Sequence, residues 1–226
     1  MSVEFFSRSP LLARIGQADL RDLVRNAEER RLAPGQLLFQ RGDPGDGVFA
    51  IVAGHVKVFL EGADGNEVIV AMRTTGDVLG ELSLLDDHRR SASAIAVDEV
   101  RTLRIAADRF QEWLLSHPAA SLGMLRELAV RLRDTTDQVA EIALLGIEAR
   151  IARRLWELLA EAAGGEPTAG MQLRVNQSDL ASFIGVTRES VNKHLARMKA
   201  SGVIAIETGR VSLLQPSALR ALAQEL

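Results

Sequence analysis

A short polar cassette, residues 80 to 94 with the sequence GELSLLDDHRRSASA, carries the groups with the clearest chemistry. A glycine lets backbone N–H groups approach an anion, and the N-terminus of a short helix adds partial positive charge. An arginine can grip a phosphate with two parallel hydrogen bonds. Glu81 cannot bind a phosphate but can accept a hydrogen bond from a sugar hydroxyl. The cassette therefore suits a sugar phosphate, although Glu81 and Arg90 could also be an ordinary ion pair and Arg89 a solvated surface charge.

A second polar set lies in residues 175 to 200, VNQSDLASFIGVTRESVNKHLARMKA. The spacing predicts two short helices, the first begun by a capping box of Asn176 and Asp179. Gly185 supplies a tight turn between two helices with apolar inner faces, a pattern typical of a helix-turn-helix. The inner faces are formed by Leu180, Ala181 and Ile184 in the first helix and by Val191 and Leu195 in the second.

The second of these helices projects polar side chains away from its apolar line: Arg188, Glu189, Ser190, Asn192, Lys193 and Arg197. Arg or Lys can read guanine O6 and N7 in a major groove, and Glu can accept a hydrogen bond from cytosine N4. Ser190 and Lys199 suit phosphate contacts. We therefore predict a DNA-reading helix, and the alternative is a small helical pair with a solvated charged face.

The stretch between the two polar sets, residues 119 to 145, is expected to form one helix of roughly 40 Å. Its apolar and small residues recur at alternating steps of three and four, which is a heptad seam that faces a partner helix: Leu122, Leu125, Ala129, Leu132, Thr136, Val139 and Ala143. Thr136 and its neighbour Thr135 are the anomaly in this seam. They either set the register of the helix pair or face a ligand.

The remaining elements follow from periodicity and turns. Residues 10 to 29 indicate short N-terminal helices, and from Leu32 onward short β-branched or aromatic runs are cut by glycine, which predicts a sandwich or small barrel. Asp64 and Gly65 form a hairpin signal. The helical pattern returns after Ile105, and VIAI and RVSLLQ around Thr208 and Gly209 indicate a terminal β-hairpin.

Composition excludes several classes of function. The 226 residues contain 47% hydrophobic residues, no cysteine and four scattered histidines, so disulfides, thiolate chemistry and a metal site are not expected. No apolar run is long enough to span a membrane and no leader is evident, so we expect a cytoplasmic protein. The net charge is −3, whereas residues 146 to 226 hold ten Lys or Arg against eight Asp or Glu. DNA binding must therefore rest on a local patch.

Three stretches together resemble one family, the CRP/FNR transcription regulators of the cyclic-AMP receptor protein type. LAPGQLLFQRGDPGDGVFAIVAGHVKVF looks like the family's β-roll, GELSLLDDHRRSA like its phosphate-binding cassette, and VTRESVNKHLARM like its recognition helix. The resemblance implies an α+β fold with a jelly-roll-like cyclic-nucleotide-binding β-roll at residues 1–118. It also implies a dimerisation helix at 119–145 and a winged helix-turn-helix DNA-binding domain at 146–226.

The resemblance also implies roles for individual residues. Glu81 would bind the ribose 2′-hydroxyl and Arg90 the cyclic phosphate, and the other expected ligand contacts are Gly80, Leu82, Ser91, Ala92, Arg131, Thr135 and Thr136. The expected DNA contacts are Thr187, Arg188, Glu189, Ser190, Asn192, Lys193 and Arg197. The implied partners are a palindromic double-stranded operator, a second copy of the chain through residues 119–145, and RNA polymerase.

Two departures from the family pattern matter. Lys193 stands where the family often has arginine, which puts the usual half-site in doubt. The cassette is one residue shorter than the enterobacterial form, which favours Arg90 for the phosphate but leaves Arg89 open. The expected effector is cyclic AMP or, as a rival, cyclic GMP, because a threonine hydroxyl can serve adenine or guanine. The alternatives are a regulator that binds DNA without cyclic nucleotide and an enzyme with a metal centre, for which the histidines are too scattered.

Overall fold

The computed structural model describes residues 3–8, 12, 15–62, 67–207 and 209–224. The contacts divide the chain into two compact units, residues 1–60 with 70–134 and residues 61–69 with 135–226. The predicted turn at Asp64 and Gly65 lies outside the described residues, and so does Thr208 of the C-terminal hairpin. In the described part of the chain, no helix is both long and apolar enough to cross a membrane.

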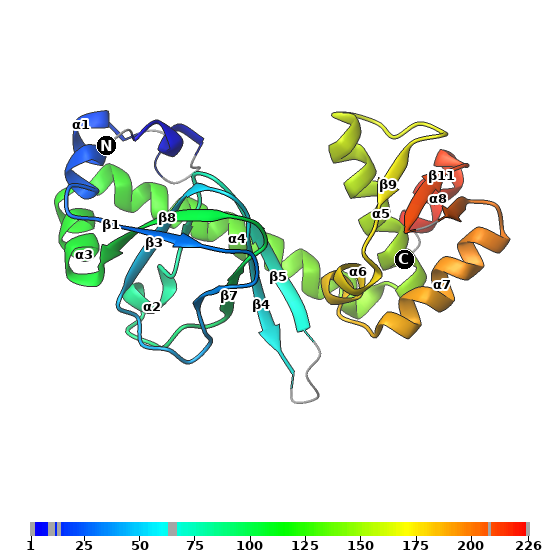
Figure 1. The fold of residues 1–226 in the computed structure, drawn as a ribbon, viewed down its shortest axis with the longest axis horizontal. Helices are drawn as coiled ribbons and strands as arrows, with labels where there is room; N and C mark the ends of the chain where they lie inside the picture. The colour runs from blue at the N-terminus through cyan, green and yellow to red at the C-terminus, as the bar shows by residue number, and fades with distance from the viewer. Residues whose placement is uncertain (1–2, 9–11, 13–14, 63–66, 208, 225–226) are drawn as a thin grey trace. The chain divides into compact units, whose positions relative to one another are not determined.

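Residues 28–106, most of which belong to the first unit, form two four-stranded sheets (Figure 1). One has the strand order β1-β8-β3-β6 and the other β2-β7-β4-β5. The strand bounds are β1 Glu28–Leu32, β2 Leu37–Phe39, β3 Gly47–Ala53, β4 Val56–Glu61, β5 Glu67–Arg73, β6 Val78–Leu79, β7 Ser93–Ala96 and β8 Val100–Ala106. The predicted β-rich domain is therefore confirmed, with β1 and β6 as additions.

Strand β3 shows why the two layers hold together. Successive side chains of a strand point to opposite faces, and both faces of β3 are buried. Val48 and Ala50 pack with the N-terminal segments and the helices, in a core that contains Trp113. Phe49 and Ile51 pack instead with residues of the other sheet. The continuous apolar run of β3 thus contributes to two cores at once.

Helices cover one face of the first unit. They are a 3₁₀ helix at Glu4–Arg8, α1 at Gln17–Leu23, the short α2 at Leu82–Leu85, α3 at Ala107–Ser116 and the first part of α4. Helix α4 runs from Pro118 to Leu144, one residue earlier at each end than predicted. Proline suits the first turn of a helix because its missing N–H would have no intrahelical partner there. Ala120 and Met124 anchor α4 in the core that contains Trp113.

The second unit contains the predicted pair of short helices. Its elements are α5 Ile147–Ala163, β9 Gln172–Arg174, α6 Gln177–Ile184, α7 Arg188–Ala200, β10 Ile204–Glu207, β11 Arg210–Leu213 and α8 Pro216–Gln224. The three strands form a sheet in the order β10-β11-β9. Leu155 and Leu159 of α5 pack with Leu180, Val191 and Leu195 in one core. The helix-turn-helix and its β-hairpin are therefore parts of one small domain.

Candidate functional site

The cassette begins at Gly80, which follows β6 and has a left-handed backbone with φ of +84°. A Cβ atom placed on Gly80 would overlap Nη1 of Arg90. Any residue other than glycine would therefore be strained here and would also displace the arginine. The predicted short helix is present as α2, which begins directly after Glu81.

Arg90 is buried, with 3% of its surface exposed, and its guanidinium lies inside the β-roll. Nη1 donates to the carbonyl oxygen of Gly80 at 2.7 Å and to Oγ of Ser83 at 2.9 Å. Nη2 donates to the carbonyl oxygen of Gly47 at 2.7 Å and to Oδ1 of Asp46 at 3.1 Å. These bonds engage all four N–H groups of the two terminal nitrogens. Arg90 thereby ties the cassette to the start of β3.

One donor of Arg90 is left over. Its Nε is buried and, within the part of the chain that the structure describes, has no hydrogen-bond partner. The guanidinium also lies 4.7 Å from the ring centre of Phe39, which covers it with an aromatic surface. A buried N–H without an acceptor is costly. An anion that accepted this hydrogen bond would remove that cost.

Asp46 links Arg90 to a second arginine. Oδ2 of Asp46 accepts a hydrogen bond from Nη2 of Arg104 at 2.9 Å, and Nη1 of Arg104 lies 3.4 Å from Oε2 of Glu28. Burial lowers the pKa of Arg90, and the negative charge of Asp46 opposes this effect. Burial alone would raise the pKa of Asp46, but the hydrogen bond and charge of Arg104 outweigh it and lower the pKa. The lowered pKa of Asp46 favours the charged carboxylate that pairs with both arginines.

Glu81 is held by Arg131, which comes from α4. Nη1 of Arg131 donates to Oε1 of Glu81 at 2.6 Å, Nε donates to Oε1 of Glu127 at 3.0 Å, and Nη2 donates to the carbonyl oxygen of Val78 at 3.2 Å. Glu81 and Glu127 are both buried. Arg131 therefore joins α4 to the cassette through Glu81, while Glu127 holds Arg131 from within α4.

Sequence reasoning missed two residues of this cluster, Glu127 and Arg73. Glu127 could have been found, because an acid four residues before an arginine is a helical pairing signal. Arg73 ends β5 and is half-buried. Burial lowers its pKa, and the positive charge of Arg131 lowers it further, while Asp77, Glu127 and Glu81 oppose the change. No pattern in the sequence indicated that Arg73 lies near this cluster.

The structure brings together four of the predicted ligand residues: Gly80, Glu81, Arg90 and Arg131. Arg89, the alternative phosphate ligand, is exposed and donates from Nη1 to the carbonyl oxygen of Gly42 at 2.8 Å. Ser91 and Leu82 are exposed, and Ala92 is partly buried. Thr135 and Thr136 follow Arg131 by about one turn of α4, are exposed in the single chain and belong to the second compact unit.

The predicted DNA-reading helix is α7. The hydroxyl of Thr187 caps its first turn by accepting a hydrogen bond from the backbone N–H of Ser190 at 3.2 Å. The side chains of Val191, Leu195 and Met198 are buried. The predicted DNA contacts on α7 are exposed, except for Ser190, which is partly buried. These contacts are Arg188, Glu189, Ser190, Asn192, Lys193 and Arg197.

Three cations of α7 are exposed. Among the described residues, no carboxylate lies within ion-pairing distance of Arg188, Lys193 or Arg197. Lys199 reaches the carbonyl oxygen of Ile206 at 3.4 Å. An unneutralised positive helix face with an apolar back fits a polyanion such as DNA.

The two helices are fixed at their ends. Oδ1 of Asn176 accepts a hydrogen bond from the N–H of Ser178 at 3.0 Å, so the predicted N-cap is present, and Gly185 ends α6 in a left-handed conformation. Nη1 of Arg150 on α5 donates to the carbonyl oxygen of Ile184 at 2.8 Å. The turn between α6 and α7 is therefore fixed by the conformation of Gly185 and by the hydrogen bond from Arg150.

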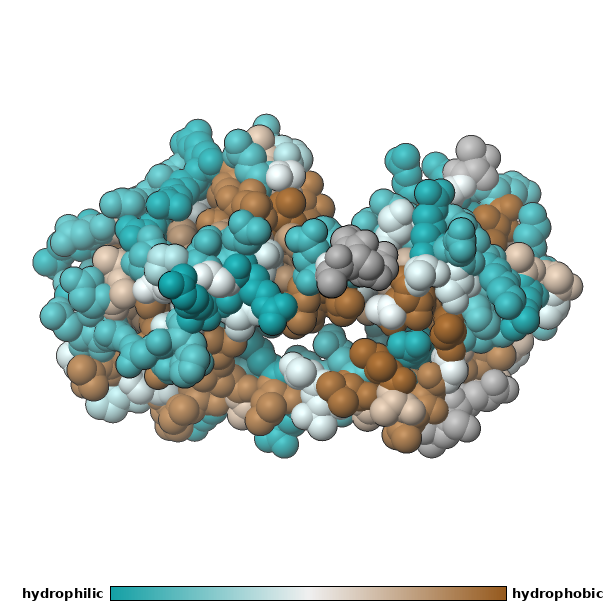
Figure 2. Space-filling model, turned by 90° about the horizontal axis from the view of Figure 1, so that it is seen from below, coloured by the Kyte–Doolittle hydropathy of each residue, from teal (hydrophilic) through white to brown (hydrophobic). Residues whose placement is uncertain are grey.

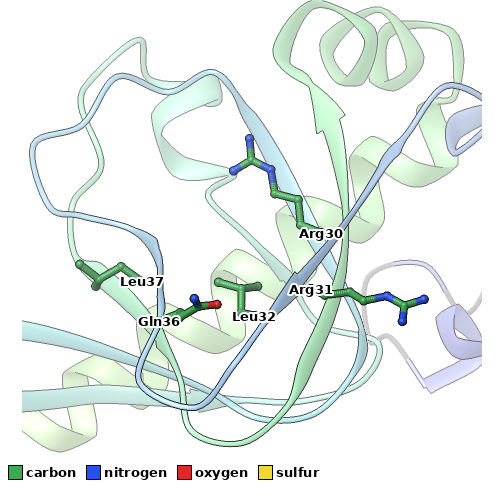
Figure 3. A pocket seen from close by; sticks show the side chains of 5 residues that line it. All are labelled: Arg30, Arg31, Leu32, Gln36 and Leu37. Carbon is green, nitrogen blue, oxygen red and sulfur yellow. The ribbon is translucent and has the colours of Figure 1, made fainter.

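A shallow surface pocket of the first unit contains none of the predicted site residues. Figure 3 shows its lining residues, Arg30, Arg31, Leu32, Gln36 and Leu37, with the two arginines leaving β1 on opposite sides. Arg31 is paired with Glu29 at 2.9 Å, and Gln36 accepts a hydrogen bond from the N–H of Ala33. These polar groups serve local structure. Across the described ranges, no group of three or more His, Cys, Asp or Glu could hold a metal ion.

Two separate parts of the chain match known protein families. Residues 29–117 match the cyclic nucleotide-binding domain, and residues 149–222 match the Crp-like helix-turn-helix domain. The CRP-like cAMP-activated global transcriptional regulator of Mycobacterium tuberculosis is 29% identical over 216 residues, which is 95% of this chain and 96% of that protein. The cyclic AMP receptor protein of Thermus thermophilus is 28% identical over 216 residues, which is 95% of this chain and 97% of that protein.

A solved structure shares the fold. The c-di-GMP-responsive global regulator CLP of Xanthomonas campestris superimposes with a TM-score of 0.79 at 24% identity, covering 88% of this chain and 99% of that chain. This likeness supports the arrangement of a β-sheet domain, a long helix and a C-terminal helix-turn-helix within one chain.

Proposed function

The chain belongs to the CRP/FNR family of transcription regulators, and on that premise we propose that it is a homodimer switched by a cyclic nucleotide, with cyclic AMP preferred. Its two parts match a cyclic nucleotide-binding domain and a Crp-like helix-turn-helix domain, and its relatives are transcription regulators and not enzymes. The effector, the dimer mechanism and a contact with RNA polymerase belong to the proposal.

The observation that carries the effector assignment is the unpaired Nε of buried Arg90. A cyclic phosphate could accept this hydrogen bond together with the backbone N–H groups of Ser91 and Ala92. Glu81 supplies the second recognition point. Its Oε1 is bonded to Arg131, and no described residue donates a hydrogen bond to its Oε2, which leaves that oxygen to accept the ribose 2′-hydroxyl.

Two bases, adenine and guanine, fit the proposed contacts of the effector. Thr135 and Thr136 are the proposed base contacts, one from each subunit, and a hydroxyl can serve the amino group of adenine or the carbonyl of guanine. The relatives from Mycobacterium tuberculosis and Thermus thermophilus are named for cyclic AMP, which favours adenine here as well. Cyclic GMP remains the rival.

The dimer proposal is supported by the exposed apolar side chains of α4. Leu122, Leu125, Leu132 and Val139 lie at seam positions and are 48–68% exposed in the single chain. The face shown in Figure 2 carries brown apolar areas among teal polar side chains. Large apolar residues in heptad register are typical of a helix pair. A second copy of α4 is the proposed occupant.

In the proposed mechanism, bound nucleotide favours one arrangement of the two α4 helices and of the domains that follow them. That arrangement places two copies of α7 about 34 Å apart, which is one turn of DNA and matches a palindromic operator. The base-reading residues are Arg188, Glu189 and Lys193. By linkage, operator DNA must tighten nucleotide binding by the same factor as nucleotide tightens DNA binding.

A second candidate is a regulator that binds DNA without a cyclic nucleotide. Two observations favour it, because groups expected to bind the ligand already have partners within the chain. Arg131 pairs with Glu81, and four N–H donors of Arg90 are used in hydrogen bonds. Titration of the full-length protein separates the candidates. We expect saturable binding of cyclic AMP, with cyclic GMP and c-di-GMP as comparison ligands. Operator binding with no affinity for any of the three would favour the second candidate.

A further inference from the structure

Glu127 is a buried acid that the proposed function leaves without a role. It lies on α4 with 8% of its surface exposed. A carboxylate is seldom buried unless it is paired, because water stabilises its charge. Its pairing partner is Arg131, one turn later on the same helix, at 3.0 Å. The acid precedes the arginine, which is the favourable order along a helix.

Arg131 does not need Glu127 for charge neutrality. Glu81 lies 2.6 Å from Nη1 of Arg131 and already supplies one negative charge. The second carboxylate instead engages Nε, the inner nitrogen of the side chain. With Nε fixed, Nη1 and Nη2 of the planar guanidinium are directed at Glu81 and at the carbonyl oxygen of Val78.

The orientation of Arg131 in turn orients Glu81. Oε1 of Glu81 is engaged by Nη1 of Arg131, so the rotation of the carboxylate is restricted, and Oε2 is the oxygen left for a ligand. The side chains of Glu81, Glu127 and Arg131 are 5%, 8% and 17% exposed, so water screens this chain of contacts little.

We propose that Glu127 is a positioning residue for the effector, which holds Arg131 so that Glu81 is fixed to accept the ribose 2′-hydroxyl. This inference rests on the proposed nucleotide site. Glu127 touches no ligand atom in this account, and its effect passes through Arg131 and Glu81. A purely structural role, in which Glu127 only balances the charges of Arg73 and Arg131, would affect every nucleotide equally.

The test compares cyclic AMP with 2′-deoxy cyclic AMP, which lacks the hydroxyl that Glu81 would bind. Isothermal titration of the full-length wild type should show weaker binding of the deoxy ligand. Glu127→Leu should weaken cyclic AMP binding about tenfold, the order expected for one hydrogen bond to a charged group. The deoxy ligand should change by less than about twofold. Glu127→Gln keeps an acceptor for Nε and should restore most of the affinity.

Controls separate this inference from the site itself. Glu112→Gln changes an exposed acid on α3 and should leave both affinities unchanged. If Glu127→Leu fails to fold, as judged by its unfolding transition, Glu127→Gln is compared with the wild type instead. Glu127→Gln should then show a smaller loss of affinity for cyclic AMP and none for the deoxy ligand. Equal losses for both ligands, or no loss for either, would overturn the positioning role alone. A wild type that binds neither ligand would overturn the proposed effector site and this inference with it.

Discussion

The guanidinium of Arg90 and the carboxylate of Asp46 form an ion pair of 3.1 Å whose partners differ sharply in exposure, with side chains 1% and 54% exposed. If the pair is broken, Asp46 can turn to water but Arg90 cannot. Removing one partner of a buried pair costs more than the pair itself contributes, because the remaining groups are left unsatisfied. Arg90 is therefore both a candidate phosphate ligand and a structural clamp.

Replacing Arg90 should have two effects. Arg90→Ala leaves the carbonyl oxygens of Gly47 and Gly80 without their donor. We expect loss of nucleotide binding and a free energy of unfolding lowered by about 3 kcal/mol, because these two carbonyl oxygens lose their hydrogen bonds. Urea unfolding and nucleotide titration measure the two effects. Arg89→Ala is the matched control, since Arg89 is exposed and makes one bond to Gly42. Loss of nucleotide binding in Arg89→Ala alone would mean that Arg89 holds the phosphate.

Asp46 should contribute to acid sensitivity. Its pKa lies below the usual 3.8, because the hydrogen bond from Arg104 and the charges of Arg104 and Arg90 outweigh the opposite effect of burial. A carboxyl with a lowered pKa stabilises the fold above its unfolded pKa, and this contribution is lost as the pH falls through the folded value.

We therefore expect the wild type to lose stability below about pH 4, and Asp46→Asn to show a shallower dependence in that range. Urea unfolding at a series of pH values from about 2.5 to 6 measures both curves. Identical slopes in the two proteins would show that Asp46 does not titrate differently in the folded state.

The seam of α4 can be tested by charge. Leu125→Lys places a cation at a seam position that is 63% exposed in the single chain. Burial of a leucine contributes roughly 1.5–3 kcal/mol, and each substitution occurs twice in a symmetric dimer. We expect dimer affinity, measured by sedimentation, to fall about 100-fold or more. Leu115→Lys, on α3 and 85% exposed, should leave it unchanged. A dimer insensitive to Leu125→Lys would place the interface elsewhere.

Base reading by α7 should show in sequence preference. Glu189→Ala should relax the preference at one base pair of each half-site, with a loss of discrimination of roughly 1–3 kcal/mol. Binding to a set of singly substituted operators measures it. Lys199→Ala, at a proposed phosphate contact, should instead weaken all sequences alike and lower the salt dependence. A uniform loss for Glu189→Ala would contradict its role as a base reader.

The sequence predicted most of the elements that carry function, since each has a strong local signal. The strands from β2 to β5 are bounded by glycine, and the α6–α7 turn is marked by Gly185 and the Thr187 cap. Strand β1 was missed because Glu28–Leu32 is almost wholly charged. It is an exposed edge strand that pairs with β8, and charged side chains are favourable on an edge strand. Strand β9 and helix α8 were also not predicted.

The internal contacts of the cassette could not be predicted from the sequence. Arg90 is buried because Asp46 and Gly47, more than 40 residues earlier, bring two acceptors to it. Glu81 is held by an arginine 50 residues later. Pairings over such separations depend on the closed β-roll and on the course of α4, which residue spacing does not encode. Only the pairing of Glu127 with Arg131 had a local signal.

The most direct test of the account is the affinity of the full-length protein for cyclic AMP, measured by calorimetry with and without operator DNA. We expect saturating operator to tighten nucleotide binding by the same factor by which nucleotide tightens operator binding, typically about 5–150-fold for allosteric coupling. An affinity for cyclic AMP that is unchanged by operator would contradict the claim that the nucleotide controls the arrangement of the two DNA-reading helices.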